Sequence, residues 1–357
     1  MRVLASPAFQ NRADNPYNFA LATALQVEGV EVCEFSWRRL LFERWDVAHV
    51  HWPEGALNTH GALRASARSL YLLLKLLYLK ARGAQLVWTV HNLESHDQRF
   101  PKLERWFWKA YLPLVDTAIH LSRSGMTLAL QAFPSLPAKG NSVIPLGHYR
   151  DLYENTSDRI AARTHLGLEL HRPVVGFIGQ IRLYKNIPAL VRAFLTGLPQ
   201  GASLILGGIP ASSAVVSELL ALTRSYPNIL CRLERIPDCE IQFYLNACDL
   251  IVLPYTDVLN SSSALLALSF NRPVLVPALG AMTELREIAG QEWVHTYTGE
   301  LTPALLREAL HWAVATTRPA VCDLRAFQWS DIGRKTVSAY QGRLPSLTNK
   351  ALLPSTI

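Results

Sequence analysis

Short apolar runs alternate with longer helical segments along almost the whole chain of 357 residues, and this alternation most constrains the fold. The runs are rich in β-branched residues and are bounded by polar residues or glycine, as expected of buried strands. Strands that alternate with helices predict an α/β fold, in which parallel sheets carry helices on both faces. The predicted strands lie at residues 2–5, 30–35, 46–52, 85–92, 117–122, 142–148, 174–179, 203–208, 228–233, 249–255 and 273–277.

The predicted strands fall into two groups, which a mostly polar segment from Tyr149 to Arg172 separates. A chain of this length can form two domains with separate cores. We therefore predict an N-terminal domain over residues 1–150 and a C-terminal domain over residues 151–357. Two such domains joined by one linker predict a ligand cleft between them.

The composition narrows the possible partners and the compartment. A net charge of +7 and a pI of about 9.2 favour an anionic partner such as a nucleotide or a lipid headgroup, while no nucleic-acid-binding module is recognisable. The five cysteines are odd in number and lack CxxC spacing, which favours free thiols over a structural zinc site. Neither a signal peptide nor a transmembrane run is recognisable, so we expect a cytoplasmic protein.

One strand leads into a candidate phosphate-binding loop. The apolar run 174–178 ends at Gly179, and the cations Arg182 and Lys185 follow. A helical pattern then begins at Asn186, a predicted N-cap. Glycine lets the backbone pass close to a ligand, and two cations beside a helix N-terminus can bind a phosphate. An ordinary turn with solvated cations is the alternative interpretation of these residues alone.

Three stretches, in the same order, form a pattern that resembles the GT-B glycosyltransferases, most of all the bacterial mannosyl- and glucosyltransferases with an E-x7-E signature. They are the loop 179–185, the segment 236–254 and the run 267–274. A looser match in the N-terminal half covers residues 49–53, 89–91 and 143–147. The resemblance implies two Rossmann-like domains that face a cleft, and a nucleotide sugar as the donor.

Departures from that signature point to a narrower family. Its two glutamates fall on Val258 and Leu266, which cannot accept a hydrogen bond, and its phosphate-binding arginine falls on Gln180. Parts of residues 5–18 and 263–270 instead resemble the inverting β-mannosyltransferases of xanthan-type exopolysaccharide assembly. Those enzymes add mannose from GDP-mannose to a polyprenyl-diphosphate-linked oligosaccharide, and the resemblance implies the same activity here, without a metal cofactor. The alternatives are a retaining glycosyltransferase with another nucleotide-sugar donor, and a catalytically inactive GT-B binding protein.

The resemblance places most of the donor site in the second domain. Arg182 and Lys185 would bind the diphosphate, together with backbone N–H groups at the start of the helix that follows residue 260. A carboxylate at Asp238 could accept two N–H groups of guanine, and capping of the next helix is the open alternative. The predicted donor-binding residues are His91, Gly179, Arg182, Lys185, Ile236, Asp238, Ser261, Ser262 and Ser263.

An inverting transfer also needs a general base that takes the proton of the acceptor hydroxyl. Asp14 follows the first strand, at a common base position of inverting GT-B enzymes, while Glu54 and Glu94 on neighbouring loops compete for the role. His91 aligns with a donor-sugar contact of related enzymes, and His51 is expected to support the loop that carries Glu54. Asp14, Glu54, His91 and Glu94 lie at or after the ends of predicted strands, where open α/β sheets bind their ligands.

Two segments of the first domain are predicted to contact an anionic membrane surface. Residues 64–82 contain five cations, no acid and a leucine-rich run, and residues 99–109 add aromatic side chains among further cations. Burial of the leucine-rich helix against the sheet is the alternative, and we expect it for one half of that helix. This interpretation implies peripheral attachment to the inner face of the cell membrane, where a lipid-linked acceptor would lie.

Overall fold

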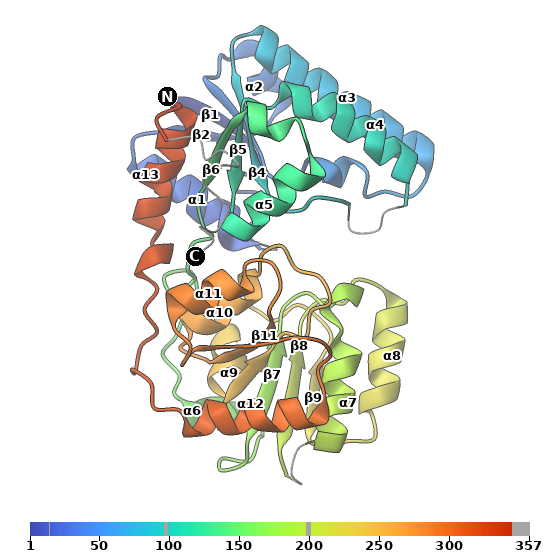
Figure 1. The fold of residues 1–357 in the computed structure, drawn as a ribbon, viewed down its shortest axis with the longest axis vertical. Coiled ribbons are helices and arrows are strands. Elements are labelled where there is room, and N and C mark those ends of the chain that lie inside the picture. Colours follow the sequence, from blue (N-terminus) through green and yellow to red (C-terminus); the bar gives the residue numbers. More distant parts are fainter. Residues whose placement is uncertain (14, 96–98, 198–200, 345–357) are drawn as a thin grey trace, which may run out of the picture. The chain divides into compact units, whose positions relative to one another are not determined.

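The computed structural model describes residues 1–13, 15–95, 99–197 and 201–344. The chain forms two compact units (Figure 1). Among the described residues, unit 1 comprises Met1–Gly147 together with Ala326–Leu344, and unit 2 comprises His148–Arg325. Each unit contains a six-stranded sheet in which all neighbouring strands are parallel, so the predicted α/β fold is confirmed.

In unit 1 the strands follow the order β2-β1-β3-β4-β5-β6. They are β1 (Arg2–Ser6), β2 (Glu31–Glu34), β3 (Val47–Val50), β4 (Gln85–Val90), β5 (Thr117–His120) and β6 (Gly140–Val143). The helices are α1 (Pro16–Val27), α2 (Trp37–Phe42), α3 (Ala62–Ala81), α4 (Pro101–Tyr111), α5 (Arg123–Ala132) and α13 (Trp329–Tyr340). Short 3-10 segments are η1 (Pro53–Ala56), η2 (Leu112–Leu114) and η3 (Leu136–Ala138), and η5 (Arg325–Phe327) lies at the return to unit 1.

In unit 2 the strands follow the order β12-β11-β10-β7-β8-β9. They are β7 (Val174–Ile178), β8 (Ser203–Gly207), β9 (Ile229–Arg232), β10 (Leu250–Val252), β11 (Val274–Pro277) and β12 (Val294–Tyr297). The helices are α6 (Arg159–His165), α7 (Ile187–Gly197), α8 (Ser213–Thr223), α9 (Ile241–Asn246), α10 (Ser262–Ser269), α11 (Met282–Ala289) and α12 (Pro303–Ala315), with the 3-10 segment η4 (Leu183–Lys185). The edge strand β12 was not predicted because it lacks an apolar run. Only its two end residues are buried.

The predicted linker, residues 149–172, contains α6 and is bound to the sheet of unit 2. Arg163 of α6 is fully buried, and its Nη2 donates to Oδ2 of Asp249 at 2.7 Å. The same carboxylate oxygen accepts the backbone N–H of Val174 at 2.8 Å. Because Asp249 directly precedes β10 and Val174 begins β7, this ion pair joins α6 to the two strands that carry the candidate site.

Helix α13 belongs to unit 1, whereas the predicted boundary assigned its residues to the C-terminal domain. It packs against α1 (Figure 1), and Ile332, Ala339 and Tyr340 enter the core of unit 1. At Gly333 the helices approach closely, since a Cβ there would lie 3.0 Å from the carbonyl oxygen of Ala24. Helical periodicity predicts a buried face but does not say which core will bury it, and this explains the difference.

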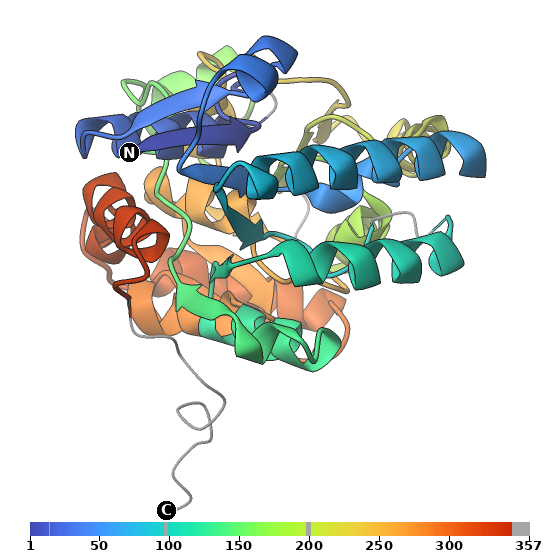
Figure 2. The same ribbon diagram turned by 90° about the horizontal axis from the view of Figure 1, so that it is seen from above.

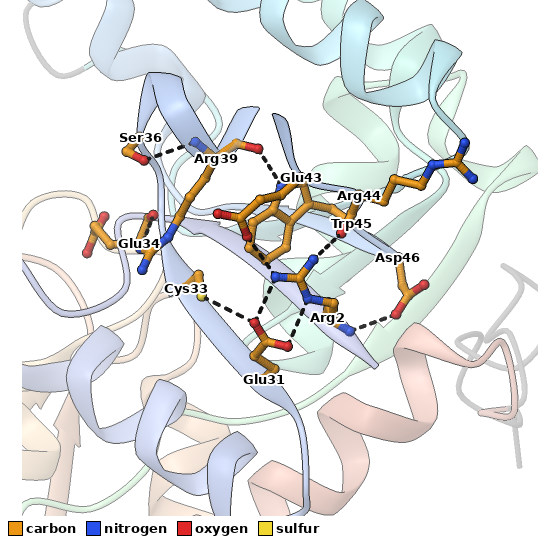
Figure 3. Close-up of polar contacts among 10 residues, drawn as sticks. All are labelled: Arg2, Glu31, Cys33, Glu34, Ser36, Arg39, Glu43, Arg44, Trp45 and Asp46. Atoms are coloured by element: carbon orange, nitrogen blue, oxygen red, sulfur yellow. Dashed lines mark hydrogen bonds and ion pairs between the residues drawn. The ribbon is translucent and has the colours of Figure 1, made fainter. Parts of the chain in front are cut away.

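An ion-pair cluster joins the amino ends of three strands in unit 1 (Figure 3). Arg2 of β1 donates to both carboxylate oxygens of Glu31 in β2, at 2.8 and 2.9 Å, and to Glu43 at 2.7 Å. The backbone N–H of Arg2 donates to Asp46, directly before β3, at 2.7 Å. The hydrogen bonds from Arg2 lower the pKa of Glu31. The cluster therefore fixes β1 against its two neighbours.

At the carboxyl end of the same sheet, Glu34 holds the loop that follows β1. Its Oε2 accepts the backbone N–H groups of Ala8, Phe9 and Gln10, at 3.0, 2.7 and 3.0 Å. Three backbone donors on one carboxylate oxygen fix residues 8–10, at the start of this loop. The ligand-binding end of the sheet is thus built on fixed backbone.

Candidate functional site

Unit 2 contains a polar cluster at the carboxyl end of β7. Gly179 follows this strand with φ of +146°, a conformation that favours glycine. A Cβ at Gly179 would lie 2.5 Å from Oγ of Ser263 and 3.5 Å from Nζ of Lys185. The structure therefore brings together three of the predicted donor-binding residues, and only a residue without a side chain fits between the hydroxyl and the ammonium group.

The ammonium group of Lys185 lies in a buried, aromatic environment. Only 8% of the residue is exposed, and Nζ lies 5.7 Å from the ring centroid of Phe177 and 5.2 Å from that of Tyr255. Burial lowers the pKa of Lys185, and no carboxylate among the described residues opposes this shift. A buried cation without a counterion is suited to an anionic ligand.

The N-terminus of α10 lies at the same cluster. Ser261 is its N-cap, and its Oγ accepts the backbone N–H of Ala264 at 3.1 Å. Ser263 is buried, whereas Ser262 is exposed. The first backbone N–H groups of a helix have no acceptor within the helix, and they carry the positive end of its dipole. This helix end, beside the buried ammonium group, forms a suitable site for phosphate.

Tyr255 also belongs to this cluster, although it is not among the residues predicted from the sequence. Its ring lies near Nζ of Lys185, and its hydroxyl lies 3.5 Å from Oγ of Ser261. The available signal was its position as the last residue of the predicted strand 249–255. What the sequence does not contain is the sheet order, which pairs β10 with β7 and so brings Tyr255 beside the loop after β7.

Of two other residues in the candidate phosphate loop, only Asn186 differs from expectation. Arg182 is partly exposed, and its Nε donates to Oε1 of Gln180 at 3.1 Å. Its charge is near enough to contribute to the lowered pKa of Lys185. Asn186 has a φ of +49° and ends η4, so it has the left-handed conformation rather than the extended one of an N-cap.

The predicted base-reading segment has one buried and one exposed residue. Ile236 is buried, and its Cδ1 would lie 2.6 Å from a Cβ at Gly207. Asp238 is exposed, and its Oδ1 accepts from Nη2 of Arg235 at 3.1 Å. The alternative role of Asp238 as a helix cap is wrong, because α9 begins at Ile241 and its N-cap position is Glu240. The guanine-reading role stays a prediction.

Unit 1 contains a histidine cluster where β3 and β4 end. Nε2 of His49 lies 2.8 Å from Oγ1 of Thr89, and Nδ1 lies 2.7 Å from the hydroxyl of Tyr340 in α13. Nδ1 of His51 lies 3.2 Å from Nε2 of His91. Burial lowers the pKa of His49 and of His91 to about 3, and that of His51 well below its usual value. The three rings are therefore neutral at physiological pH, and each is a single-proton donor.

His91, the predicted donor-sugar contact, is held on several sides. Its ring stacks on Trp52, with centroids 4.3 Å apart, and meets the edge of Tyr17 at 5.3 Å. Its Nε2 is engaged by His51, so its Nδ1 is the nitrogen left for other contacts. His51 thus orients His91, whereas the sequence had suggested a supporting role for the loop of Glu54.

Glu54 in η1 is a buried carboxyl group with one unpaired oxygen. The residue is 2% exposed, and its Oε1 accepts from Nδ2 of Asn92 at 2.7 Å. Its Oε2 is buried and has no hydrogen-bond partner among the residues that the structure describes. Burial raises the pKa of Glu54 to about 7. A carboxyl group with this pKa changes its protonation near neutral pH, as a general base requires.

The other two candidate bases have different positions. Glu94 is exposed on the loop after β4. The buried Glu104 fixes the next residue of this loop, since its two oxygens accept from the backbone N–H and the hydroxyl of Ser95 at 2.6 and 2.7 Å. Asp14 lies outside the described residues.

Helices α2 and α3 carry exposed apolar side chains. We call the surface that these side chains form the α2–α3 face. Its residues are Trp37, Leu41, Phe42, Leu70, Tyr71, Leu74, Leu77 and Tyr78. Phe42 is 78% exposed and Leu74 56% exposed. The rings of Trp37 and Tyr71 lie 5.1 Å apart, which makes the two helices one surface. The opposite side of α3 is buried, as expected for half of that helix.

Helix α4 lies beside α3 (Figure 2), but its aromatic residues contribute less to the surface than expected. Trp106 is 45% exposed, whereas Phe107 and Trp108 are buried in the core of unit 1. The expectation of exposed aromatic side chains over 99–109 is therefore wrong for these two, because they pack against Trp88 and Tyr111. Among the described helices, none has the length and apolar character needed to cross a bilayer.

Comparison with known proteins identifies relatives along almost the entire chain. No family model matches. Over 338 residues the chain is 31% identical to a GDP-mannose:glycolipid 4-β-D-mannosyltransferase of Xanthomonas campestris pv. campestris, with 95% of this chain and 91% of that protein covered. This identity and coverage show family membership.

Solved structures with the same fold include HepE of Anabaena in complex with UDP and glucose. The TM-score is 0.64 at 16% identity, covering 96% of this chain and 97% of that one. Sucrose-phosphate synthase of Thermosynechococcus elongatus matches with a TM-score of 0.66 at 16% identity, covering 98% of this chain and 95% of that one. The chain therefore has the GT-B fold and is a glycosyltransferase that belongs to the family of the GDP-mannose:glycolipid 4-β-D-mannosyltransferases.

Proposed function

We propose that this glycosyltransferase transfers mannose from GDP-mannose to a polyprenyl-diphosphate-linked oligosaccharide in bacterial exopolysaccharide synthesis, with inversion to a β-linkage. The similarity to the Xanthomonas enzyme supports the donor and the glycolipid acceptor. The observation that carries the proposal is the convergence of Gly179, Lys185 and Ser263 at one strand end. A buried cation beside a helix N-terminus can bind the diphosphate of a nucleotide sugar.

In this proposal, unit 2 binds the donor and stabilises the leaving group. As the bond between C1 and the phosphate oxygen breaks, negative charge grows on the GDP. The ammonium group of Lys185 and the first N–H groups of α10 stabilise that charge, and the partly exposed Arg182 adds a second cation. Asp238 would exchange its ion pair with Arg235 for two N–H groups of guanine, beside the apolar Ile236. No metal ion has a role in this scheme.

The inverting mechanism rests on two features of the site. Val258 and Leu266 occupy the positions of the signature glutamates, so the α-face of the donor lacks carboxylates that would assist a front-side transfer. A base must then take the proton of the acceptor hydroxyl, and Asp14, Glu54 and Glu94 are the candidates. Between the two that the structure describes, the raised pKa and unpaired oxygen of Glu54 favour it over the exposed Glu94.

The α2–α3 face supports a peripheral position at the cytoplasmic membrane surface. Its exposed leucines and aromatic rings can enter the interfacial region of a bilayer. Lys75 lies next to them, with Nζ 4.0 Å from the ring centroid of Phe35. Arg68 lies on the same helix, and Arg82 is its C-cap residue. Apolar side chains bordered by cations suit an anionic lipid surface, where a lipid-linked acceptor is found.

Product analysis tests the reaction directly. Purified protein would be incubated with GDP-mannose and a synthetic lipid-linked acceptor, and proton NMR would report the configuration of the new anomeric centre. We expect a β-linked mannoside, and UDP-glucose or GDP-glucose should give a much slower reaction. An α-linked product would contradict the inverting mechanism. Tight donor binding without hydrolysis or transfer would favour the inactive binding protein.

Vesicle flotation tests the membrane surface separately. Leu74→Glu places a charge in the α2–α3 face and should abolish co-flotation with vesicles that contain anionic lipid. Leu128→Glu is the matched control, because Leu128 is 41% exposed on α5, outside this face. Equal flotation of the two variants would contradict the assignment.

A further inference from the structure

Asn260 has an amide side chain whose hydrogen-bonding groups find no partner in the part of the chain that the structure describes. Both Oδ1 and Nδ2 are buried, and neither has a hydrogen-bond partner among the residues that the structure describes. Buried polar groups in folded proteins are almost always hydrogen-bonded, because an unsatisfied one is costly. An amide that lacks both a donor and an acceptor partner is therefore a candidate for a ligand contact.

The backbone on both sides of Asn260 is fixed. Ala281 donates its N–H to the carbonyl oxygen of Leu259 at 3.2 Å. Gly280 has a φ of +51°, and a Cβ at this residue would lie 2.0 Å from the carbonyl oxygen of Val258. On the other side, Ser261 begins α10 as its N-cap. The loop after β11 thus presses against the loop of Asn260, and the amide has little freedom to reach another partner.

Asn260 is also next to the proposed phosphate site. Oγ of the neighbouring Ser261 lies 3.5 Å from the hydroxyl oxygen of Tyr255. The ring centroid of Tyr255 in turn lies 5.2 Å from Nζ of Lys185. In a nucleotide sugar the hexose is bonded to the distal phosphate. A side chain directly before the helix that binds this phosphate is therefore placed to contact the hexose.

We propose that the side-chain amide of Asn260 binds two hydroxyl groups of the donor hexose. Its Nδ2 donates to one hydroxyl oxygen, and its Oδ1 accepts from the other. The amide can both donate and accept a hydrogen bond, whereas the side chains of Val258 and Leu266 can do neither. This inference rests on the proposed function and assigns its sugar specificity to one residue.

Calorimetry with GDP and GDP-mannose, on the wild type, Asn260→Ala and Asn260→Asp, tests this role. We expect Asn260→Ala to bind GDP within about twofold of the wild type, because GDP lacks the hexose, whereas the negative charge of Asn260→Asp beside the diphosphate should weaken GDP as well. Asn260→Ala should bind GDP-mannose about ten- to a hundredfold more weakly. Asn260→Asp keeps the acceptor but loses the N–H donor, so it should also be weakened. Thr256→Ser, an exposed change on the same loop that keeps the hydroxyl bound to the carbonyl oxygen of Tyr184, should match the wild type.

Thermal unfolding separates sugar binding from a structural role. Removal of an unsatisfied amide should leave the Tm of Asn260→Ala unchanged or higher. A lowered Tm together with an equal loss of GDP and GDP-mannose affinity would overturn the inference. If the wild type binds another nucleotide sugar instead, the proposed donor is wrong. The same comparison between that donor and its nucleotide still decides the role of Asn260.

Discussion

The hydroxyl of Tyr340 lies 2.7 Å from Nδ1 of His49, although 291 residues separate them in the chain. Both residues are buried, and Nε2 of His49 contacts Thr89 at its other side. The last described helix is therefore tied to the strand end that precedes the candidate catalytic loop. His51 and His91 lie beside this pair, with the rings of His49 and His51 4.2 Å apart.

Loss of the Tyr340 hydroxyl should destabilise unit 1. Tyr340→Phe keeps the ring but leaves a nitrogen of His49 without its partner, which costs about 1–3 kcal/mol. Urea denaturation should show this decrease in the free energy of unfolding. Tyr226→Phe changes an exposed tyrosine of unit 2 and should stay within about 0.5 kcal/mol of the wild type. Equal stability of the two variants would show that the His49 contact is not formed in solution.

The buried histidines should make the protein acid-sensitive. Their pKa values are lowered in the fold, to about 3 for His49, so between pH 6.5 and 3 the unfolded chain binds more protons than the native one. Stability should therefore fall as the pH decreases below about 6.5. His49→Gln should reduce the slope of Tm against pH in this range. His171→Gln, at an exposed histidine of unit 2, should keep the wild-type slope.

The proposed phosphate site can be tested by removing its cations and by filling the space beside Gly179. Lys185→Ala and Arg182→Ala should reduce donor affinity and turnover by roughly ten- to a thousandfold. Gly179→Ala should have a comparable effect, because its Cβ would lie 2.5 Å from Oγ of Ser263. Arg192→Ala, which removes an exposed cation of α7, is the control for net charge. Wild-type kinetics in Lys185→Ala and Gly179→Ala would exclude this site.

Ionisation of the Glu54 carboxyl group should support activity but lower the stability of the fold. Its raised pKa of about 7 means that the native state binds more protons than the unfolded state between pH 4.5 and 7, so this carboxyl group lowers stability as the pH rises. Glu54→Gln should be more stable than the wild type at pH 8, by on the order of 3 kcal/mol, and no more stable at pH 4. Unfolding at the two pH values measures this difference.

The same variant, with its two competitors, identifies the general base. Glu54→Gln should abolish transfer if Glu54 is the base, while GDP affinity is kept. For the wild type, kcat should then rise with pH through about 7. Asp14→Asn and Glu94→Gln are nearly isosteric comparisons. Loss of transfer in Asp14→Asn alone would assign the role to Asp14 and leave the inverting mechanism intact.

The sequence was sufficient for eleven of the twelve strands in the described residues, and it pointed to much of the proposed phosphate site. Buried strands such as β7 are continuous apolar runs, and Gly179 and Lys185 follow directly from the loop after it. Tyr255 and Asn260 were missed because their importance arises from neighbours that only the sheet order and the loop after β11 supply. Phe107 and Trp108 show the converse, since aromatic residues among cations can still belong to the core.

The return of the chain to unit 1 has a consequence for how the protein is made. A ribosome releases all of unit 2 before α13, so unit 2 has its whole sequence while unit 1 still lacks a helix of its core. Until then, the apolar side of α1 that includes Leu21 and Leu25 lacks the cover that α13 supplies. A chain that stops after Arg325 would keep all of unit 2 but lack the helix that completes the core of unit 1. Nascent and truncated chains therefore expose the same apolar patch to chaperones and proteases.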